Sequence, residues 1–246
     1  MTQVFGNKRT IAVFVLPTFI LFVVVGLVPI VQSAYYSLLK WDGLQVPEFV
    51  GLANFYDLFV TDNFGVMFGN SVLNSFMLVV LSVFIQLPLA LLLAMVLASG
   101  VRGEKTYRTL FFLPVVVSSA VIGVMFLMIY SPNFGMLNIL FDSLGIGELK
   151  HDWLADPSTA LYAILGPIVW QFIGYHMLLM YAAIKAVPDE IFEAAKIDGA
   201  SAIHTAFSIT IPMITPILRV CVVFAVVGSL KLFDAVYVMT AGLTYP

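Results

Sequence analysis

The residues best suited to an interaction lie in a long polar gap, late in an otherwise apolar chain. This gap, at residues 193–212, has the sequence EAAKIDGASAIHTAFSITIP. Gly199 can take the left-handed conformation that ends a helix, and Ser201 is a candidate cap for a second helix. The pattern therefore predicts two short helices joined by a glycine turn. A first helix of about ten residues is about 15 Å long, so it could seat in a groove of a soluble partner and offer Glu193 to a basic residue there.

Ionisable side chains within the apolar stretches form a second group of candidates. Lys231 and Asp234 are one helical turn apart, and charges inside a membrane usually face a cavity or each other. Two interpretations stay open: a local ion pair at the outer interface or, together with Ser229, an approach to a translocation path. Arg219 lies near the opposite end of the same stretch and is expected to snorkel to the headgroups. His176 is either a packed, hydrogen-bonded histidine or a substrate contact.

Other kinds of chemistry find little support. Cys221 is the single cysteine, so the chain can form neither an internal disulfide nor a cysteine metal cluster. His151 and His204 are spaced wrongly from each other and from carboxylates for a metal site. The sequence has no Gly-rich phosphate loop ending in Lys-Ser or Lys-Thr, so it is not expected to bind ATP itself. A membrane-embedded enzyme would need convergent catalytic groups at one depth, and the apolar stretches offer few ionisable side chains.

Composition places the chain in a membrane. Of its 246 residues, 61% are hydrophobic and only 10% are charged, whereas soluble domains carry about 25% charged residues. The mean hydropathy is +1.05. Such a chain cannot cover a water-facing surface and must be embedded in a bilayer, in contact with lipid. Its net charge of −3 argues against a nucleic-acid partner.

Five apolar stretches are long enough to cross the hydrocarbon core, which takes about 20 residues. Four of them lack any Asp, Glu, Lys or Arg, and the fifth is interrupted by three charges. The sequence therefore predicts an all-α polytopic membrane protein, with residues 1–246 forming a single transmembrane domain. The first stretch is too long for a secretory signal and is interpreted as a retained helix. The predicted spans cover about residues 10–39, 69–99, 108–130, 159–184 and 213–240.

The basic residues predict the orientation of these spans. Seven of them precede the first span or lie in the loops at 102–108 and 185–196, whereas the loops on the other side hold only Lys40 and Lys150. Because positive residues concentrate in cytoplasmic loops, the N-terminus and the loop at 185–212 are predicted to be cytoplasmic. Eight carboxylates then gather on the outside: Asp42, Glu48, Asp57, Asp62, Asp142, Glu148, Asp152 and Asp156.

Short helices and kinks are expected at particular positions. Apolar residues at 52, 55, 56 and 59 have helical spacing, which predicts a short outer helix lying on the membrane face. A second short outer helix is expected near residues 136–144. Pro88, Pro114 and Pro167 fall inside predicted spans, where each removes a backbone donor and is expected to kink its helix.

The spacing in the polar loop resembles the cytoplasmic coupling loop of ATP-binding-cassette importer permeases. The run Glu-Ala-Ala at 193–195 is followed after three residues by Gly199, after nine more by Ile209, and then by Ile211 and Pro212. Ile211 stands where the family usually has Leu. The resemblance covers nearly the whole chain and points to carbohydrate-uptake permeases of the maltose type and the glycerol-phosphate type. Further similar motifs are RG at 102–103, YRTLFFLP at 107–114, Trp170 with Gly174 and Tyr175, AVP at 186–188, IDGA at 197–200, FD at 233–234 and YVMT at 237–240.

This resemblance implies a transport subunit rather than an enzyme, with ATP hydrolysis on partner subunits and no cofactor in this chain. Contact with an ATPase carries over to Glu193, Ala194, Ala195, Asp198 and Gly199. The implied partners are a second, unlike permease subunit, two ATP-binding-cassette ATPase subunits and an extracytoplasmic solute-binding protein. The implied location is the bacterial cytoplasmic (inner) membrane.

For the substrate, the resemblance favours a sugar or an oligosaccharide, with the chain forming half of the translocation pathway. A permease for glycerol-phosphate, an amino acid or a peptide stays open as the alternative. Aromatic side chains could stack on sugar rings, because they offer flat apolar faces with a polar edge. The candidate residues of the substrate path are Trp170, Gly174, Tyr175, Ser229, Lys231 and Asp234.

The chain departs from the family pattern at its C-terminal end. Family members have six core spans, whereas five are predicted here. The residues 241–246, AGLTYP, also stand where the family usually has a Gly-Gly-Pro run. We therefore expect that a sixth span has been lost from this end.

Overall fold

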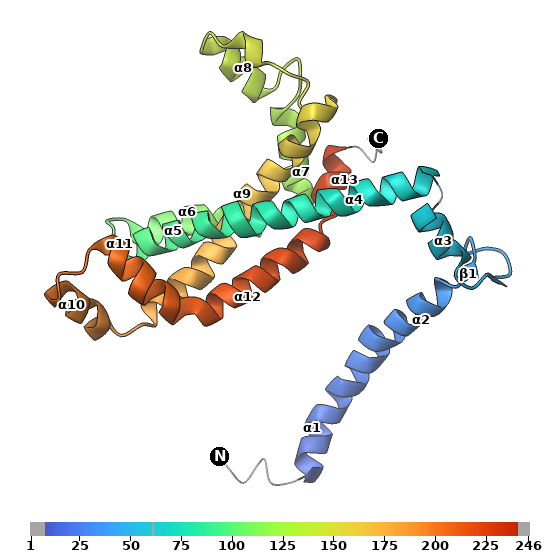
Figure 1. The fold of residues 1–246 in the computed structure, drawn as a ribbon, viewed down its shortest axis with the longest axis horizontal. Coiled ribbons are helices and arrows are strands. Elements are labelled where there is room, and N and C mark those ends of the chain that lie inside the picture. Colours follow the sequence, from blue (N-terminus) through green and yellow to red (C-terminus); the bar gives the residue numbers. More distant parts are fainter. Residues whose placement is uncertain (1–7, 61, 241–246) are drawn as a thin grey trace. The chain divides into compact units, whose positions relative to one another are not determined.

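The computed structural model describes residues 8–60 and 62–240. The described residues are almost wholly helical, which confirms the all-α class. The chain divides into two compact units, residues 1–70 and 71–246, coloured from blue to red along the sequence in Figure 1.

The first unit contains a long apolar helical stretch and a small hairpin. Residues 12–36 form one candidate span with a hydropathy of 2.8. The predicted outer helix is found, and its Asn54 Nδ2 donates a hydrogen bond of 2.9 Å to the Leu39 carbonyl, which anchors it to the hairpin. The elements are α1 (Lys8–Leu21), the π-helical η1 (Phe22–Leu27), α2 (Val28–Tyr36), the antiparallel strands β1 (Leu39–Lys40) and β2 (Glu48–Phe49), and α3 (Ala53–Val60).

The second unit holds the remaining helices. α4 (Asp62–Leu81) begins in the first unit and continues into the second. A short helix lies where the second outer loop was predicted to contain one. The further elements are η2 (Ser82–Gln86), α5 (Leu87–Ala98), α6 (Glu104–Val116), α7 (Ser119–Ile129), α8 (Met136–Ser143), η3 (Gly147–Leu149), α9 (Pro157–Lys185), α10 (Asp189–Ile197), α11 (Ala202–Thr205), η4 (Ala206–Thr210), α12 (Ile211–Leu230) and α13 (Asp234–Met239).

α9 is the central helix of the second unit and packs against α5, α6 and α12 (Figure 1). Ala90 and Ala94 of α5 are fully buried, and such small residues let helix backbones approach closely in a membrane. Met177 of α9 and Cys221 of α12 are also fully buried in this cluster. Cys221 therefore packs as a small apolar side chain.

Three prolines that open α-helical segments follow π-helical turns. Pro29, Pro88 and Pro212 each lie in the first two positions of α2, α5 and α12, directly after η1, η2 and η4. A proline lacks the backbone donor of the regular helix, and a π-turn is one way in which a helix absorbs such a disruption. Pro167, in contrast, lies inside α9, which runs unbroken from residue 157 to residue 185.

Two of the predicted continuous spans are broken. The third is a bent pair, α6 and α7, whose axes differ by 95°, with the break at Val117 and Ser118 rather than at Pro114. The fifth stops at Leu230, and α13 begins at Asp234. In the described residues, four helices are long and apolar enough to cross a membrane, or five if the bent pair counts as one span.

Candidate solute pocket and coupling loop

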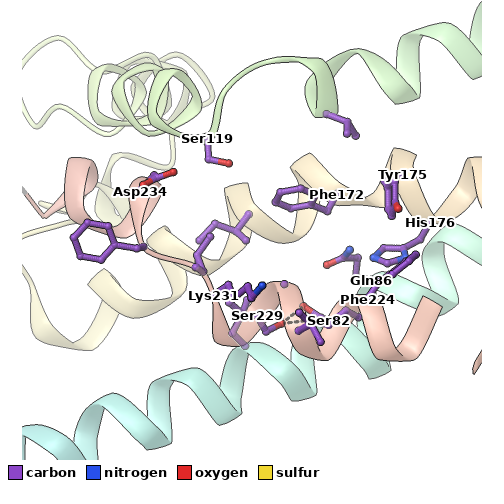
Figure 2. Close-up of a pocket in the computed structure, with 18 residues that line it drawn as sticks. Ser82, Gln86, Ser119, Phe172, Tyr175, His176, Phe224, Ser229, Lys231 and Asp234 are labelled. Carbon is purple, nitrogen blue, oxygen red and sulfur yellow. Dashed lines mark hydrogen bonds between the residues drawn. The ribbon is translucent and has the colours of Figure 1, made fainter. Parts of the chain in front are cut away.

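A cavity of about 480 Å³ lies inside the second unit, between η2, α9, α12 and the break that separates α6 from α7. Figure 2 shows polar side chains from several of these elements gathered around it. The volume is within the range of about 300–1,000 Å³ that small-molecule sites occupy. The cavity is therefore the candidate solute site of this chain.

One end of the cavity is neutral and polar. Gln86 and His176 are each only 3% exposed, and both line the cavity. Nδ1 of His176 has no hydrogen-bond partner among the described residues. Ser229 donates to the Ala225 carbonyl at 2.7 Å, and its Oγ lies 3.2 Å from the Ser82 hydroxyl. Buried polar groups are costly when unsatisfied, so this end is suited to hydrogen-bonding groups of a ligand.

Aromatic rings form a wall beside these polar groups. Phe172, Tyr175 and Phe224 all line the cavity. The Tyr175 ring lies 6.1 Å from the Phe224 ring and 5.3 Å, edge to face, from the His176 ring. Flat apolar faces next to hydrogen-bonding groups are the combination that a sugar ring can use, because it is apolar on its faces and hydroxylated at its edge.

The other end of the cavity carries two charges on the broken fifth span. Lys231 is the C-terminal cap of α12, and Asp234 is in the first turn of α13, so each complements the dipole of its helix end. They form no ion pair with each other: the ion pair found among the described residues is between Lys150 and Asp142, at 2.8 Å. Both charged side chains, with Ser229, line the cavity (Figure 2).

Two predicted path residues face other surroundings. The Trp170 ring packs edge to face on Phe126 at 5.9 Å and is 44% exposed. A Cβ atom on Gly174 would lie 1.9 Å from the Phe111 carbonyl oxygen, so α6 approaches α9 closely at Gly174. Because successive helical residues turn by about 100°, these two residues lie on faces of α9 different from the one that carries Phe172, Tyr175 and His176.

Sequence reasoning missed several residues of the cavity wall. Ser82 and Gln86 lie in a stretch that has no charged residue, and both are buried. Polar side chains inside a membrane span usually face the protein interior or a cavity. The polarity of Ser82 and Gln86 within an apolar stretch could therefore have identified them as residues that face a cavity. Phe172, Phe224 and Ser119 give no comparable signal, since aromatic and small residues are common in any span.

The polar loop forms one short helix, α10, and the glycine turn that its spacing predicts. The second predicted helix is not separate: it begins at Ala202 and runs through η4 into α12, so that the fifth span starts at residue 202 rather than at 213 and ends at Leu230. α10 begins after Pro188, which is its N-terminal cap. Ala195 is buried, whereas Glu193, Ala194, Asp198 and Gly199 are exposed. The loop therefore presents most of its candidate docking residues to the surroundings and uses Ala195 for packing.

The turn after α10 is held by backbone hydrogen bonds. Gly199 has a φ of +73°, and its N–H donates to the Lys196 carbonyl at 3.1 Å, while the Ala200 N–H donates to the Ala195 carbonyl at 2.9 Å. This pair of bonds is the Schellman pattern that ends a helix. The Ser201 side chain then caps α11 by accepting from the His204 N–H at 3.2 Å.

Two carboxylates outside the spans are held in their ionised form. The side chain and the backbone N–H of Ser158 donate to Asp156, at 2.7 and 2.8 Å, and lower the pKa of its carboxyl. The backbone N–H groups of Gln45 and Leu44 likewise lower the pKa of Asp42. Asp156 thereby caps α9, the helix that carries the aromatic wall of the cavity.

Comparison with known proteins agrees with these features. Residues 86–246 match the family described as binding-protein-dependent transport system inner membrane component. The probable ABC transporter permease protein YurN of Bacillus subtilis (strain 168) is 37% identical over 240 residues, 96% of this chain and 80% of that protein. The diacetylchitobiose uptake system permease protein NgcF of Streptomyces coelicolor is 32% identical over 230 residues, 89% of this chain and 64% of that protein. A crystal structure of a bacterial ABC transporter involved in alginate import matches with a TM-score of 0.74 at 21% identity, covering 93% of this chain and 79% of that one.

A broken-helix membrane fold, a mainly apolar cavity with a few polar side chains in its wall and an exposed Glu193 in the polar loop are features that agree with a transport permease. The chain belongs to the family of inner membrane components of binding-protein-dependent transport systems. It is therefore an integral membrane transport subunit of an ABC importer, not a catalytic enzyme. The family resemblance of the sequence is confirmed.

Proposed function

We propose that this chain forms half of the translocation pathway of an ATP-driven importer for a sugar or an oligosaccharide, and that the cavity holds the solute in transit. The observation that carries the proposal is the cavity itself, in which Tyr175 and two phenylalanine rings lie beside Gln86 and His176. Two similar proteins are named for carbohydrates, diacetylchitobiose for one and alginate for the other, and this supports the same substrate class here.

Each part of the cavity has a proposed role. The ring of Tyr175 stacks against a sugar face, and Gln86 and His176 exchange hydrogen bonds with hydroxyl groups that water solvates outside the membrane. Ser229 contacts the solute beside Ser82, and Lys231 and Asp234 contact it at the other end. Trp170 and Gly174 contribute to this site only through packing.

The exposed loop has the proposed role of coupling. Glu193, Ala194, Asp198 and Gly199 contact a cytoplasmic ATPase subunit, and Ala195 is buried beneath them. Ile191 and Phe192 pack α10 against the core cluster of the second unit. The proposed complex contains a second, unlike permease subunit, two ATP-binding-cassette ATPases and an external solute-binding protein. The N-terminus is cytoplasmic in this arrangement. ATPase closure would displace the loop, and transport requires that the solute and the ATPases bind the two states of the permease with different affinity.

Uptake by the complete complex, reconstituted in proteoliposomes, tests the proposal. Labelled maltose, diacetylchitobiose and an alginate oligosaccharide are offered beside an amino acid and a dipeptide. Tyr175→Ala should raise the concentration for half-maximal uptake of the transported sugar by about tenfold, which corresponds to about 1.4 kcal/mol of binding. Tyr162→Ala is the matched control, because Tyr162 is on the same helix, 63% exposed and outside the cavity.

The alternative substrate class has its own signature. Uptake of the amino acid or the dipeptide, with no sugar taken up, would replace the carbohydrate assignment. Equal effects of Tyr175→Ala and Tyr162→Ala would remove the cavity from the solute path.

A further inference from the structure

The break between α6 and α7 leaves a carbonyl without a helical donor. In a continuous helix the Val117 carbonyl would accept from the Val121 N–H. Here Val117 is extended, and the Val121 N–H turns instead to the Ser118 side chain, at 3.5 Å. Inside a bilayer no water is at hand to satisfy such a carbonyl, and each unsatisfied backbone group is costly.

Gln171 of α9 supplies the missing donor. Its Nε2 donates to the Val117 carbonyl at 2.9 Å, across 54 residues of sequence. The side chain is only 1% exposed, and its Oε1 has no partner among the residues that the structure describes. A glutamine that satisfies one carbonyl while leaving its own oxygen unpaired is poorly explained as general packing, because an apolar side chain of the same size would avoid that cost.

The bonded break also sets the wall of the cavity. Val115, just before the break, and Ser119, just after it, both line the cavity. α7 then packs on α13 at Gly123, where an added Cβ would lie 3.2 Å from Val238. α13 carries Asp234, and Figure 2 places Ser119 and Asp234 on the same side of the cavity. The position of the cavity wall at Ser119 and Asp234 therefore depends on the direction in which the chain turns at Val117.

We propose that Gln171 is a positioning residue of the transport pathway: its hydrogen bond to the Val117 carbonyl fixes the 95° bend and so holds Val115 and Ser119 at the cavity wall. The part of this role that concerns the solute rests on the proposed function, whereas the effect of Gln171 on the bend does not. Gln171 itself does not line the cavity. Its effect on a solute is therefore exerted through the bend.

Cysteine labelling next to the bend tests the positioning role of Gln171 and does not require the solute to be known. In the assembled complex carrying Cys221→Ala, a cysteine is placed by Ser119→Cys, and its rate of labelling by a water-soluble maleimide is measured. Gln171→Met keeps the length of the side chain but cannot donate. It should change the labelling rate by about tenfold, as expected for loss of a buried hydrogen bond. Gln171→Glu should stay within about twofold, because its uncharged form, favoured where water is absent, still has one donor.

Two further variants separate positioning from general damage. Met177→Leu perturbs the fully buried core of the same helix, and it should leave the labelling rate within about twofold because volume-conserving swaps are well tolerated. Ser118→Ala tests the break from the other side. It frees the Val121 N–H to compete for the Val117 carbonyl, so it should shift labelling in the same direction as Gln171→Met, even where that variant does not assemble.

The outcomes for the two proposals differ. A labelling rate unchanged in both Gln171→Met and Ser118→Ala overturns the positioning role, as does an equal change in Met177→Leu. The solute concentration for half-maximal uptake should rise in Gln171→Met, with less change in the maximal rate. In Gln171→Glu this concentration should return to that of the unchanged protein. If labelling behaves as expected while no sugar is transported by any form, the carbohydrate proposal fails and the positioning role stands.

Discussion

The hydroxyl of Tyr181 donates a hydrogen bond to the carboxylate of Glu104, across 77 residues of sequence. The guanidinium of Arg108 lies 5.1 Å from the centre of the same ring, within the distance of a cation–π interaction. Tyr181 is in the last turns of α9, shortly before α10, whereas Glu104 begins α6. The bond therefore joins the helix that leads into the coupling loop to the helix that reaches the cavity wall.

Tyr181→Phe should weaken the coupling between ATP hydrolysis and transport. The variant keeps the ring over which Arg108 lies and removes only the hydroxyl, and a hydrogen bond to a charged group contributes about 1.5–3 kcal/mol. We expect fewer solute molecules transported per ATP hydrolysed, measured in proteoliposomes at matched assembly. Tyr107→Phe on α6 is the control, since its side chain is exposed. An unchanged ratio in Tyr181→Phe would show that the bond is only structural.

The effect of replacing Gly199 should depend on how readily the new residue adopts a positive φ. No atom lies within 4 Å of a Cβ built at this position, so the cost is conformational, about 1–2 kcal/mol for most residues. Gly199→Asn should lose less uptake than Gly199→Asp, and Gly199→Val should lose most. Uptake and membrane insertion are measured in parallel. Equal uptake in all three variants would contradict the need for this turn.

Glu193→Lys tests the charge that the loop offers, because Glu193 is exposed and its reversal should not disturb the fold. Uptake should fall while the amount of inserted subunit stays unchanged. Lys196→Glu is the matched control, because it also reverses an exposed charge on the same helix, and it should reduce uptake less than Glu193→Lys. Normal uptake in Glu193→Lys would remove this carboxylate from the ATPase contact.

The coupling loop was predictable because its determinants are local. Gly199, Ser201 and the residues around them end one helix and start the next with bonds that span at most five residues. The broken third span was not predictable in the same way. Pro114 predicted a kink in this span, but the break lies at Val117 and Ser118. We ascribe its position to the hydrogen bond from Gln171 to the Val117 carbonyl, across 54 residues of sequence, and the residues of the span do not carry that information.

The choice of path residues shows a similar limit. Tyr175, Ser229, Lys231 and Asp234 line the cavity, and their polarity or charge in an apolar stretch was a sound signal. Gly174 lies elsewhere because α6 packs against it. Which face of α9 turns to a neighbouring helix follows from tertiary packing and not from residue type.

Gly174→Ala should destabilise the protein, whereas Gly166→Ala should not. Both glycines are in α9, but a Cβ at position 174 would meet the Phe111 backbone at 1.9 Å, while one at position 166 has open space. Overpacking against a backbone costs about 1–3 kcal/mol or more, and a glycine-to-alanine change in a free helical position gains up to about 1 kcal/mol. Thermal unfolding of the purified complex measures both. A lower midpoint for Gly166→Ala than for Gly174→Ala would contradict the close contact.

The start of α9 should loosen only at acid pH. The pKa of Asp156 is lowered by the donors of Ser158, so its ionised form is favoured in the folded protein. Its contribution to stability is present above the ordinary pKa of an aspartate, about 3.9, and is lost as the pH falls through the lowered folded value. Amide exchange at Ser158 and Thr159, corrected for intrinsic rates, should therefore be slow at pH 5–7 and accelerate below about pH 4. Asp156→Ala should remove the dependence.

Lys231 and Asp234 should act independently, since they form no ion pair with each other and lie on different helix ends. Lys231→Leu and Asp234→Leu are each expected to raise the solute concentration for half-maximal uptake. In the double variant the two effects, expressed as free energies, should add. A true pair would behave otherwise: each single change would leave a charge uncompensated, and the double change would be nearly neutral. Leu230→Ala, exposed and outside the cavity, is the control. A fully active double variant at matched assembly would exclude both charges from the solute path, whereas a defect in Lys231→Leu that Asp234→Leu does not rescue would support direct contact between Lys231 and the solute.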